Sequence, residues 1–194
     1  MAPIICRRAL GFLVLLAAIG TTARAVPVPY TLDPRYATIG FSTSGLLGTH
    51  GYFEKFTGML VLDVQAPEHS AMNVTLDDRA IVMSYPAGVG MLRSAAYFDS
   101  ANFPQIRFRS LSVSRASSPG HFEIRGALTI RGITKPQTME ALLLDAPTGS
   151  HSAGTADVYV TGTLRRSAFG MVADRTMVND AVVLNIHARV MLAK

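Results

Sequence analysis

Histidine and arginine side chains offer most of the chemistry available to this 194-residue chain, which has five histidines and a single cysteine. The histidines stand at no metal-ligand spacing, and the sequence contains no G-x-S-x-G, H-E-x-x-H or glycine-rich phosphate loop. Two of them lie at predicted strands: His50 precedes a long one, and His187 is on the polar side of the last. A hydrolase or isomerase that uses His50 or His187 with a nearby acid is therefore an alternative that the sequence leaves open.

Arg93 is the arginine best placed for binding, because it lies in an aromatic stretch, residues 91–108 (MLRSAAYFDSANFPQIRF). Beside an apolar cavity, a guanidinium can bind a phosphate or polar headgroup with two parallel hydrogen bonds. Apolar spacing in the first half of the stretch predicts a short helical turn, and Pro104 forces Phe103 toward an extended conformation that starts a strand. We interpret the stretch as a lid over a cavity, and the alternative is a crossover loop that fills its own local core.

The remainder of the chain after residue 28 alternates as strands, which would have to position this stretch. Gly51, Gly58 and Gly126 mark bends or bulges, and residues 131–132 (RG) fit a tight hairpin turn. Long strands with one apolar face predict a closed antiparallel barrel, with a β-sandwich as the alternative. A barrel of about eight strands can hold one small or elongated ligand. The expected strands lie within residues 30–32, 38–44, 51–64, 72–83, 105–113, 121–130, 133–144, 157–166 and 181–192.

Residues 1–25 have the pattern of a cleaved signal peptide, which leaves residues 26–194 as one mature domain. An arginine pair precedes an apolar segment, residues 9–19, that is too short to span a bilayer, and residues 23–25 (ARA) fit a cleavage site. We therefore expect an exported protein that uses the general secretory route. The arginine pair makes the twin-arginine route the alternative.

Cleavage would also change the charge and the redox chemistry of the chain. It would remove Cys6 and three of the 18 basic side chains, leaving 15 basic against 13 acidic side chains and a net charge of +2. A mature chain without cysteine has no disulfide framework, and a charge of +2 does not argue for nucleic-acid binding.

Five segments resemble the YceI-like family of exported lipid-binding β-barrels, and the resemblance spans residues 30–190. It implies an extended, lipocalin-like antiparallel barrel of about eight strands with a short helical cap, located in the periplasm. It implies no catalytic residue, and we expect no metal and no cofactor other than a bound polyisoprenoid or quinone-like lipid. The segments are YTLDP at 30–34, GYFEKFTG at 51–58, LRS, YFD and FPQIRFRS between 92 and 110, GALTIRGITKP at 126–136 and RSAFGM at 166–171. The residues expected to form the lipid tunnel and its cap are Phe41, Phe53, Phe56, Met91, Leu92, Arg93, Tyr97, Phe98, Phe103, Phe108 and Phe169.

The chain departs from the usual pattern of that family at the polar end of the pocket. Residues 36–37 (YA) stand where a His-Ser pair is usual, and Ala96 and Ala168 stand where the family has aspartate. Residues 86–91 (PAGVGM) replace a charged helical turn that ends in histidine. We expect Arg93 to make the headgroup contact that remains. Since each buried CH₂ contributes about 0.8 kcal/mol, the lost polar groups would broaden specificity rather than abolish binding.

The sequence thus predicts a non-catalytic protein that binds, stores or carries a long-chain apolar amphiphile such as a polyisoprenoid or a quinone. Its expected partner is the lipid, with no nucleic acid and no stable membrane anchor, and a homodimer is left open. An alternative from another class is a protein-interaction or stress-response module whose barrel is filled by its own side chains.

Overall fold

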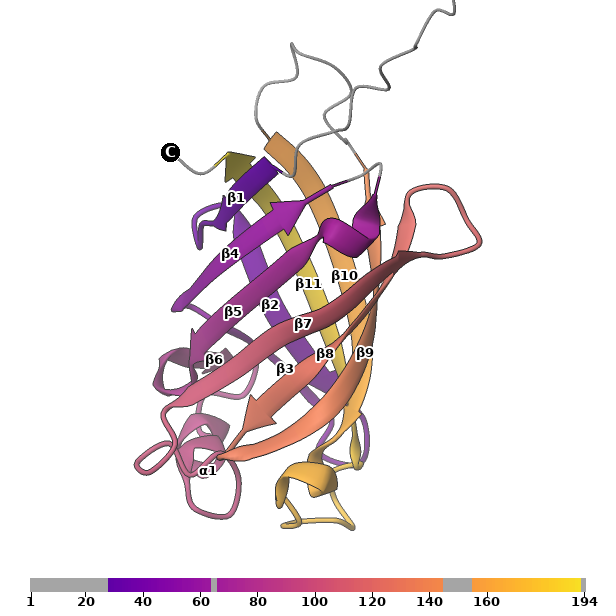
Figure 1. Ribbon diagram of the computed structural model, residues 1–194. Helices are drawn as coiled ribbons and strands as arrows, with labels where there is room; N and C mark the ends of the chain where they lie inside the picture. Colours follow the sequence, from indigo (N-terminus) through magenta and orange to yellow (C-terminus); the bar gives the residue numbers. More distant parts are fainter. Residues whose placement is uncertain (1–27, 64–65, 145–154, 193–194) are drawn as a thin grey trace, which may run out of the picture.

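The computed structural model describes residues 28–63, 66–144 and 155–192, and it consists almost entirely of β-strands (Figure 1). The expected signal peptide, its cleavage site and Cys6 lie outside the described residues. The strands are β1 (Val28–Leu32), β2 (Ala37–Thr43), β3 (Thr49–Phe53), β4 (Phe56–Leu62), β5 (Ala71–Asp77), β6 (Ile81–Met83), β7 (Gln105–Arg115), β8 (His121–Ile130), β9 (Ile133–Leu143), β10 (Thr155–Arg165) and β11 (Ala181–Leu192). The helical elements are η1 (Pro67–His69), η2 (Asp78–Ala80), α1 (Gly88–Arg93) and η3 (Arg166–Phe169).

The strands form one antiparallel sheet in the order β1-β4-β5-β7-β8-β9-β10-β11-β2-β3-β6. β1 also pairs with β11, which closes the sheet on itself as a barrel. Long neighbouring strands such as β8, β9, β10 and β11 wrap around the interior at a steep tilt (Figure 1). The all-β antiparallel class predicted from the alternation of apolar residues is therefore confirmed.

The strand count differs from the predicted eight, because the described residues form eleven strand segments. β1 and β2 both pair with the same edge of β11, β3 and β4 are separated only by Glu54 and Lys55, and β5 and β6 are separated only by η2. Three long strands are thus each interrupted once, and the barrel keeps eight positions around its circumference. The break between β1 and β2 is a turn at Asp33-Pro34, where the Tyr36 N–H donates to the Asp33 carbonyl at 2.9 Å.

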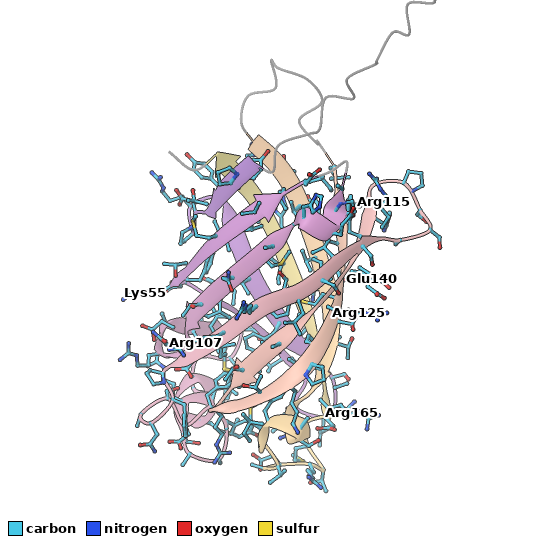
Figure 2. All side chains as sticks on the ribbon, in the orientation of Figure 1. Lys55, Arg107, Arg115, Arg125, Glu140 and Arg165 are labelled. Atoms are coloured by element: carbon cyan, nitrogen blue, oxygen red, sulfur yellow. The ribbon has the colours of Figure 1, made fainter. Side chains whose placement is uncertain are left out.

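The alternation of side chains along each strand gives the barrel a polar, solvent-exposed outer face and an apolar interior. Along β8, every second residue from Phe122 to Ile130 is buried. Outside, Lys55, Arg107, Arg125, Glu140 and Arg165 project from the barrel into solvent (Figure 2). The β8–β9 hairpin turns through two residues of positive φ, Arg131 at 52° and Gly132 at 71°, which confirms the tight turn expected there.

One end of the barrel is covered by residues 84–104, which link β6 to β7 and include α1 (Figure 1). This segment is held by its own backbone: the Phe98 N–H donates to the Leu92 carbonyl at 2.9 Å, and the Ser100 N–H donates to the Arg93 carbonyl at 3.0 Å. Asp99 turns the chain with a φ of 54°. A short helix is therefore present as α1, but it begins earlier than the turn predicted from Leu92 to Phe98, whose later residues form hydrogen-bonded turns. We call residues 84–104 the cap. Within the described part of the chain, no helix has the length and apolar character to cross a membrane.

Candidate ligand-binding cavity

The interior of the barrel contains a cavity of about 370 Å³. All eleven strands contribute side chains to its lining, most of them aliphatic or aromatic residues on the inward positions of the alternation. Pockets in this size range, with apolar walls and a few polar groups, are typical of small-molecule sites. A barrel filled by its own side chains would leave no such space.

Three phenylalanines connect the wall of the cavity to the cap. The ring of Phe41 in β2 lies 5.9 Å from that of Phe53 in β3, and the Phe53 ring lies 6.4 Å from that of Phe98 in the cap, in tilted arrangements. Gly51 makes room for the first contact, since a Cβ at that position would lie 2.7 Å from the Phe41 ring. The cap thus contributes an aromatic surface that continues the wall across the end of the barrel.

Arg166 forms the other side of this end. It is only 3% exposed, and its three guanidinium nitrogens donate to backbone carbonyls of the loop between η3 and β11: Nε to Asn179 at 3.2 Å, Nη1 to Met171 at 2.9 Å and Nη2 to Val178 at 2.9 Å. Its guanidinium also lies 5.8 Å from the centre of the Tyr97 ring. Arg166 therefore contributes a positive charge to the cavity lining, and its guanidinium nitrogens hydrogen-bond the loop between η3 and β11.

Tyr97 ties the cap to the same loop. Its hydroxyl donates to Asp174 Oδ2 at 2.8 Å across 77 residues of sequence. Burial and then this hydrogen bond raise the pKa of Tyr97 to about 12. The phenol therefore stays neutral at physiological pH and acts as a hydrogen-bond donor between the two segments.

Polar groups gather at the two ends of the cavity, and the walls between them are apolar except for Gln137 of β9, whose Nε2 donates to the Thr138 carbonyl at 2.8 Å and to the Thr163 carbonyl at 3.1 Å. At the cap end, the hydroxyls of Thr43, Thr49 and Ser84 lie on or next to the neighbouring strands β2, β3 and β6. At the opposite end, beside η1, are Asp63 and Ser70 (Figure 1). The buried Asp63 carboxylate accepts from the Ala66 N–H at 2.8 Å, and the Ser70 hydroxyl accepts from the Asp63 N–H at 2.9 Å.

Three lining residues at the cap end are also open to solvent. Leu47 is 53% exposed, Tyr85 is 64% exposed and Met91 is 41% exposed. The first belongs to the β2–β3 loop and the other two belong to the cap. Exposed apolar side chains that continue into an apolar cavity mark its mouth, so the cap end is where a ligand would enter.

Seven of the eleven residues expected in the tunnel and cap lie in the cavity lining. The other four do not line it. Phe56 and Phe169 are buried in the hydrophobic core, but outside the cavity wall. Phe103 is 39% exposed and lies against Gly132, so it covers the outside of the β8–β9 hairpin. The seven in the lining are Phe41, Phe53, Met91, Leu92, Tyr97, Phe98 and Phe108.

Arg93, the expected headgroup contact, is exposed at the end of α1 and does not line the cavity. Its charge acts instead on the buried Asp78, whose pKa is raised by burial and lowered in part by Ser100 and by nearby charges that include Arg93. Arg166 was not among the residues expected at the site. The available signal was the RSAFG segment that follows β10, although its spacing alone does not show a buried guanidinium.

The two histidines considered for catalysis lie on the outside of the barrel. His50 and His187 are both exposed. The His187 ring stacks on Tyr159 with centroids 4.3 Å apart, and its Nε2 lies 3.7 Å from Asp157 Oδ1. Neither belongs to the cavity lining, and the described residues contain no group of three or more His, Cys, Asp or Glu side chains that could hold a metal ion.

Comparisons with known proteins agree with this architecture. Residues 30–190 match the family model of the YceI-like domain. Protein YceI of Salmonella arizonae is 31% identical over 184 residues, which cover 91% of this chain and 93% of that protein. Burkholderia cenocepacia BcnA superposes with a TM-score of 0.72 at 20% identity, covering 82% of this chain and 98% of that one. A polyisoprenoid binding domain from Saccharophagus degradans gives a TM-score of 0.66 at 12% identity, over 86% and 99% of the two chains.

Proposed function

Because this chain belongs to the YceI-like family, we propose that it binds a long-chain apolar amphiphile, such as a polyisoprenoid or an isoprenoid quinone, in the barrel cavity and acts without catalysis. The observation that carries the proposal is the cavity of about 370 Å³, whose walls are mostly aliphatic and aromatic. Burying a chain of ten or more carbons there would supply about 0.8 kcal/mol for each CH₂. The likeness to a polyisoprenoid binding domain supports the same ligand class.

We further propose that the mature protein, residues 26–194, acts in the periplasm after its signal peptide is cleaved. Export would bring a soluble carrier to the space between two membranes, where a long apolar chain cannot cross water unaided. N-terminal sequencing of the protein recovered from a periplasmic extract should begin at Val26. A chain that retains residues 1–25, or that stays in the cytoplasmic fraction, would contradict this location.

The binding proposal is tested by lipid extraction and mass spectrometry of the mature protein, purified from a Gram-negative host. We expect a stoichiometric isoprenoid lipid, and displacement of that lipid by added prenyl lipids or quinones. Repeated preparations that carry no lipid and bind none of the added compounds would overturn the proposal.

Two cap phenylalanines provide a matched pair of variants. Phe98 is buried in the cavity lining, whereas Phe103, five residues later, lies outside it. Phe98→Asp places a carboxylate where the ligand chain would lie, and we expect retained lipid to fall by more than about tenfold. Phe103→Asp should leave retention close to the wild-type value. Thermal melts confirm that both variants are folded, and equal retention in the two variants would show that the cap does not contact the ligand.

A further inference from the structure

We infer that the cap end of the cavity binds an uncharged, oxygen-bearing headgroup, such as an alcohol or a quinone carbonyl, through a direct hydrogen bond with the hydroxyl of Thr43. The inference rests on the proposed function and adds two things to it. It orients the ligand with its headgroup at the mouth, and it excludes phosphate as the preferred headgroup.

Thr43 is the last residue of β2, and it stands directly opposite Thr49 of β3 in the strand pairing. Both side chains line the cavity. Thr49 Oγ1 is satisfied, because it lies 3.0 Å from Ser84 Oγ. Thr43 Oγ1 is buried and has no hydrogen-bond partner in the described part of the chain. A buried hydroxyl without a partner is costly, so a ligand oxygen that pairs with it gains more than the same oxygen would gain in water.

The charges around the cavity argue against an anionic headgroup. Among the described residues that line it, the charged ones are Arg166 and Asp63. Three of the five N–H groups of Arg166, one on each nitrogen, already donate to loop carbonyls, so no pair of nitrogens is free for a two-point contact with a phosphate. Asp63 at the opposite end would repel an anion that entered with its headgroup first. Arg93, which could have paired with a phosphate, lies outside the lining. A phosphate would therefore lose its water without gaining a dedicated cation, which is expensive in a low-dielectric interior.

A headgroup position at the mouth of the cavity is consistent with an amphiphilic ligand, which has one polar end and one long apolar chain. The hydroxyls of Thr43, Thr49 and Ser84 form a polar edge next to the exposed Leu47 and Tyr85, and the aliphatic wall begins immediately behind them. An amphiphile that inserts its chain first would place its oxygen at this edge and its chain against the wall. Asp63 and Ser70 at the far end already bond to each other and to neighbouring backbone, so they offer less to a headgroup.

The test uses three compounds with the same branched C20 skeleton: phytane, phytol and phytyl phosphate. Their affinities for the mature protein are measured by displacement of diphenylhexatriene. We expect phytol to bind more tightly than phytane and more than about tenfold more tightly than phytyl phosphate. Thr43→Val keeps the shape of the side chain and removes the hydroxyl. It should weaken phytol by roughly twofold to tenfold and leave phytane unchanged.

Thr38→Val is the control, since Thr38 is exposed on the outer face of the same strand and should affect none of the three affinities. Thr43→Ser keeps a hydroxyl and should restore phytol binding. The inference is overturned if phytyl phosphate binds as tightly as phytol, or if Thr43→Val binds phytol as the wild type does. If Thr43→Val fails to fold, the ranking of phytol and phytyl phosphate on the wild-type protein decides the question. Failure of all three compounds to displace the probe would overturn the proposed function itself.

Discussion

In the barrel wall, inward side chains from eight strand positions share the burial, and each one contacts neighbours of the same apolar kind. At the cap end, a few polar groups hold together segments that are far apart in the sequence. Arg166 binds three carbonyls of the loop before β11, and Tyr97 reaches Asp174 of that loop from the cap. The wall therefore distributes its stability over many contacts, and the cap end concentrates it in very few.

This difference predicts how each region responds to a single substitution. Shortening one wall side chain removes only the apolar contacts of that side chain, because the contacts among its neighbours remain. A polar residue at the cap end joins segments that are far apart in the sequence, and its removal leaves buried loop carbonyls, such as those of Met171 and Val178, without their donor. The largest effects should thus come from the cap end, although the wall contains far more buried surface.

Arg166→Met is expected to have the largest effect. The substitution keeps much of the apolar stem, but it removes three hydrogen bonds from a charged donor, and such bonds each contribute about 1.5–3 kcal/mol. Because parts of the loop can reach water after the change, we expect the free energy of unfolding to fall by about 3–5 kcal/mol in urea denaturation. The entrance of the cavity should loosen as well, since Met171 and Val178 are lining residues of the same loop.

The neighbouring Arg165 provides the control for this change. It is the last residue of β10, and its side chain is exposed (Figure 2). Arg165→Met should change the free energy of unfolding by no more than about 0.5 kcal/mol. If both variants lose the same free energy of unfolding, the three hydrogen bonds of Arg166 do not stabilise the fold. The proposed difference between the wall and the cap end would then be wrong.

Gly126→Ala tests how tightly the barrel wall is packed. A Cβ at this position would overlap the Phe108 ring and lie 2.6 Å from the Arg109 carbonyl of the adjacent strand β7. The Phe108 ring can turn toward the cavity, but the backbone carbonyl of Arg109 cannot move far in a closed barrel, so we expect a loss of roughly 1–3 kcal/mol in the free energy of unfolding. Thermal and urea denaturation should agree on this value.

Gly90→Ala is the matched change at the cap end. Gly90 lies in α1, and a Cβ added there would meet nothing within 4 Å. Alanine favours the helix over glycine, so this variant should be as stable as the wild type or more stable by about 0.5–1 kcal/mol. A loss similar to that of Gly126→Ala would show that α1 is packed more tightly than its exposed face indicates.

The same difference explains how much could be predicted from the sequence. Alternating apolar residues predicted the wall and its class, because inward and outward positions differ by one residue and only one register buries the apolar face. Phe41, Phe53 and Phe108 were assigned to the cavity on that basis, and they line it. A short helical turn was expected between the strands because Leu92, Ala95 and Ala96 recur at helical spacing, and the structure has α1 starting just before it, at Gly88–Arg93.

The residues that were misplaced lie where long-range contacts decide the orientation. Arg93 and Arg166 have similar sequence surroundings, since each is followed by Ser-Ala and then by an aromatic residue within four positions. One is exposed and the other is buried, because carbonyls from residues 171–179 surround only Arg166. Phe103 was assigned to the cavity as an aromatic residue of the cap, but it packs on the β8–β9 hairpin, which the sequence does not place beside it.

Tyr97→Phe should be less destabilising than Arg166→Met or Gly126→Ala, and it separates the hydrogen bond from the apolar contacts of the cap end. The ring remains against Arg166, and only the hydroxyl bond to Asp174 is lost. We expect a decrease of about 1 kcal/mol in the free energy of unfolding, within the usual range for one net hydrogen bond.

The pH dependence of that decrease identifies its source. The pKa of Tyr97 rises from its ordinary value of 10.0 to about 12 in the folded protein, so folding favours the neutral phenol. The stability that Tyr97 contributes is therefore complete below pH 10 and is lost as the pH rises from 10 toward 12. The difference between wild type and Tyr97→Phe should narrow over this range, because burial and then the hydrogen bond to Asp174 disfavour the phenolate in the folded protein, whereas a Tyr97 hydroxyl open to water would keep the difference constant. If the difference in the free energy of unfolding stays constant, the cap end is stabilised by apolar packing, as the wall is. The conclusion that a few polar contacts stabilise the cap end would then be wrong.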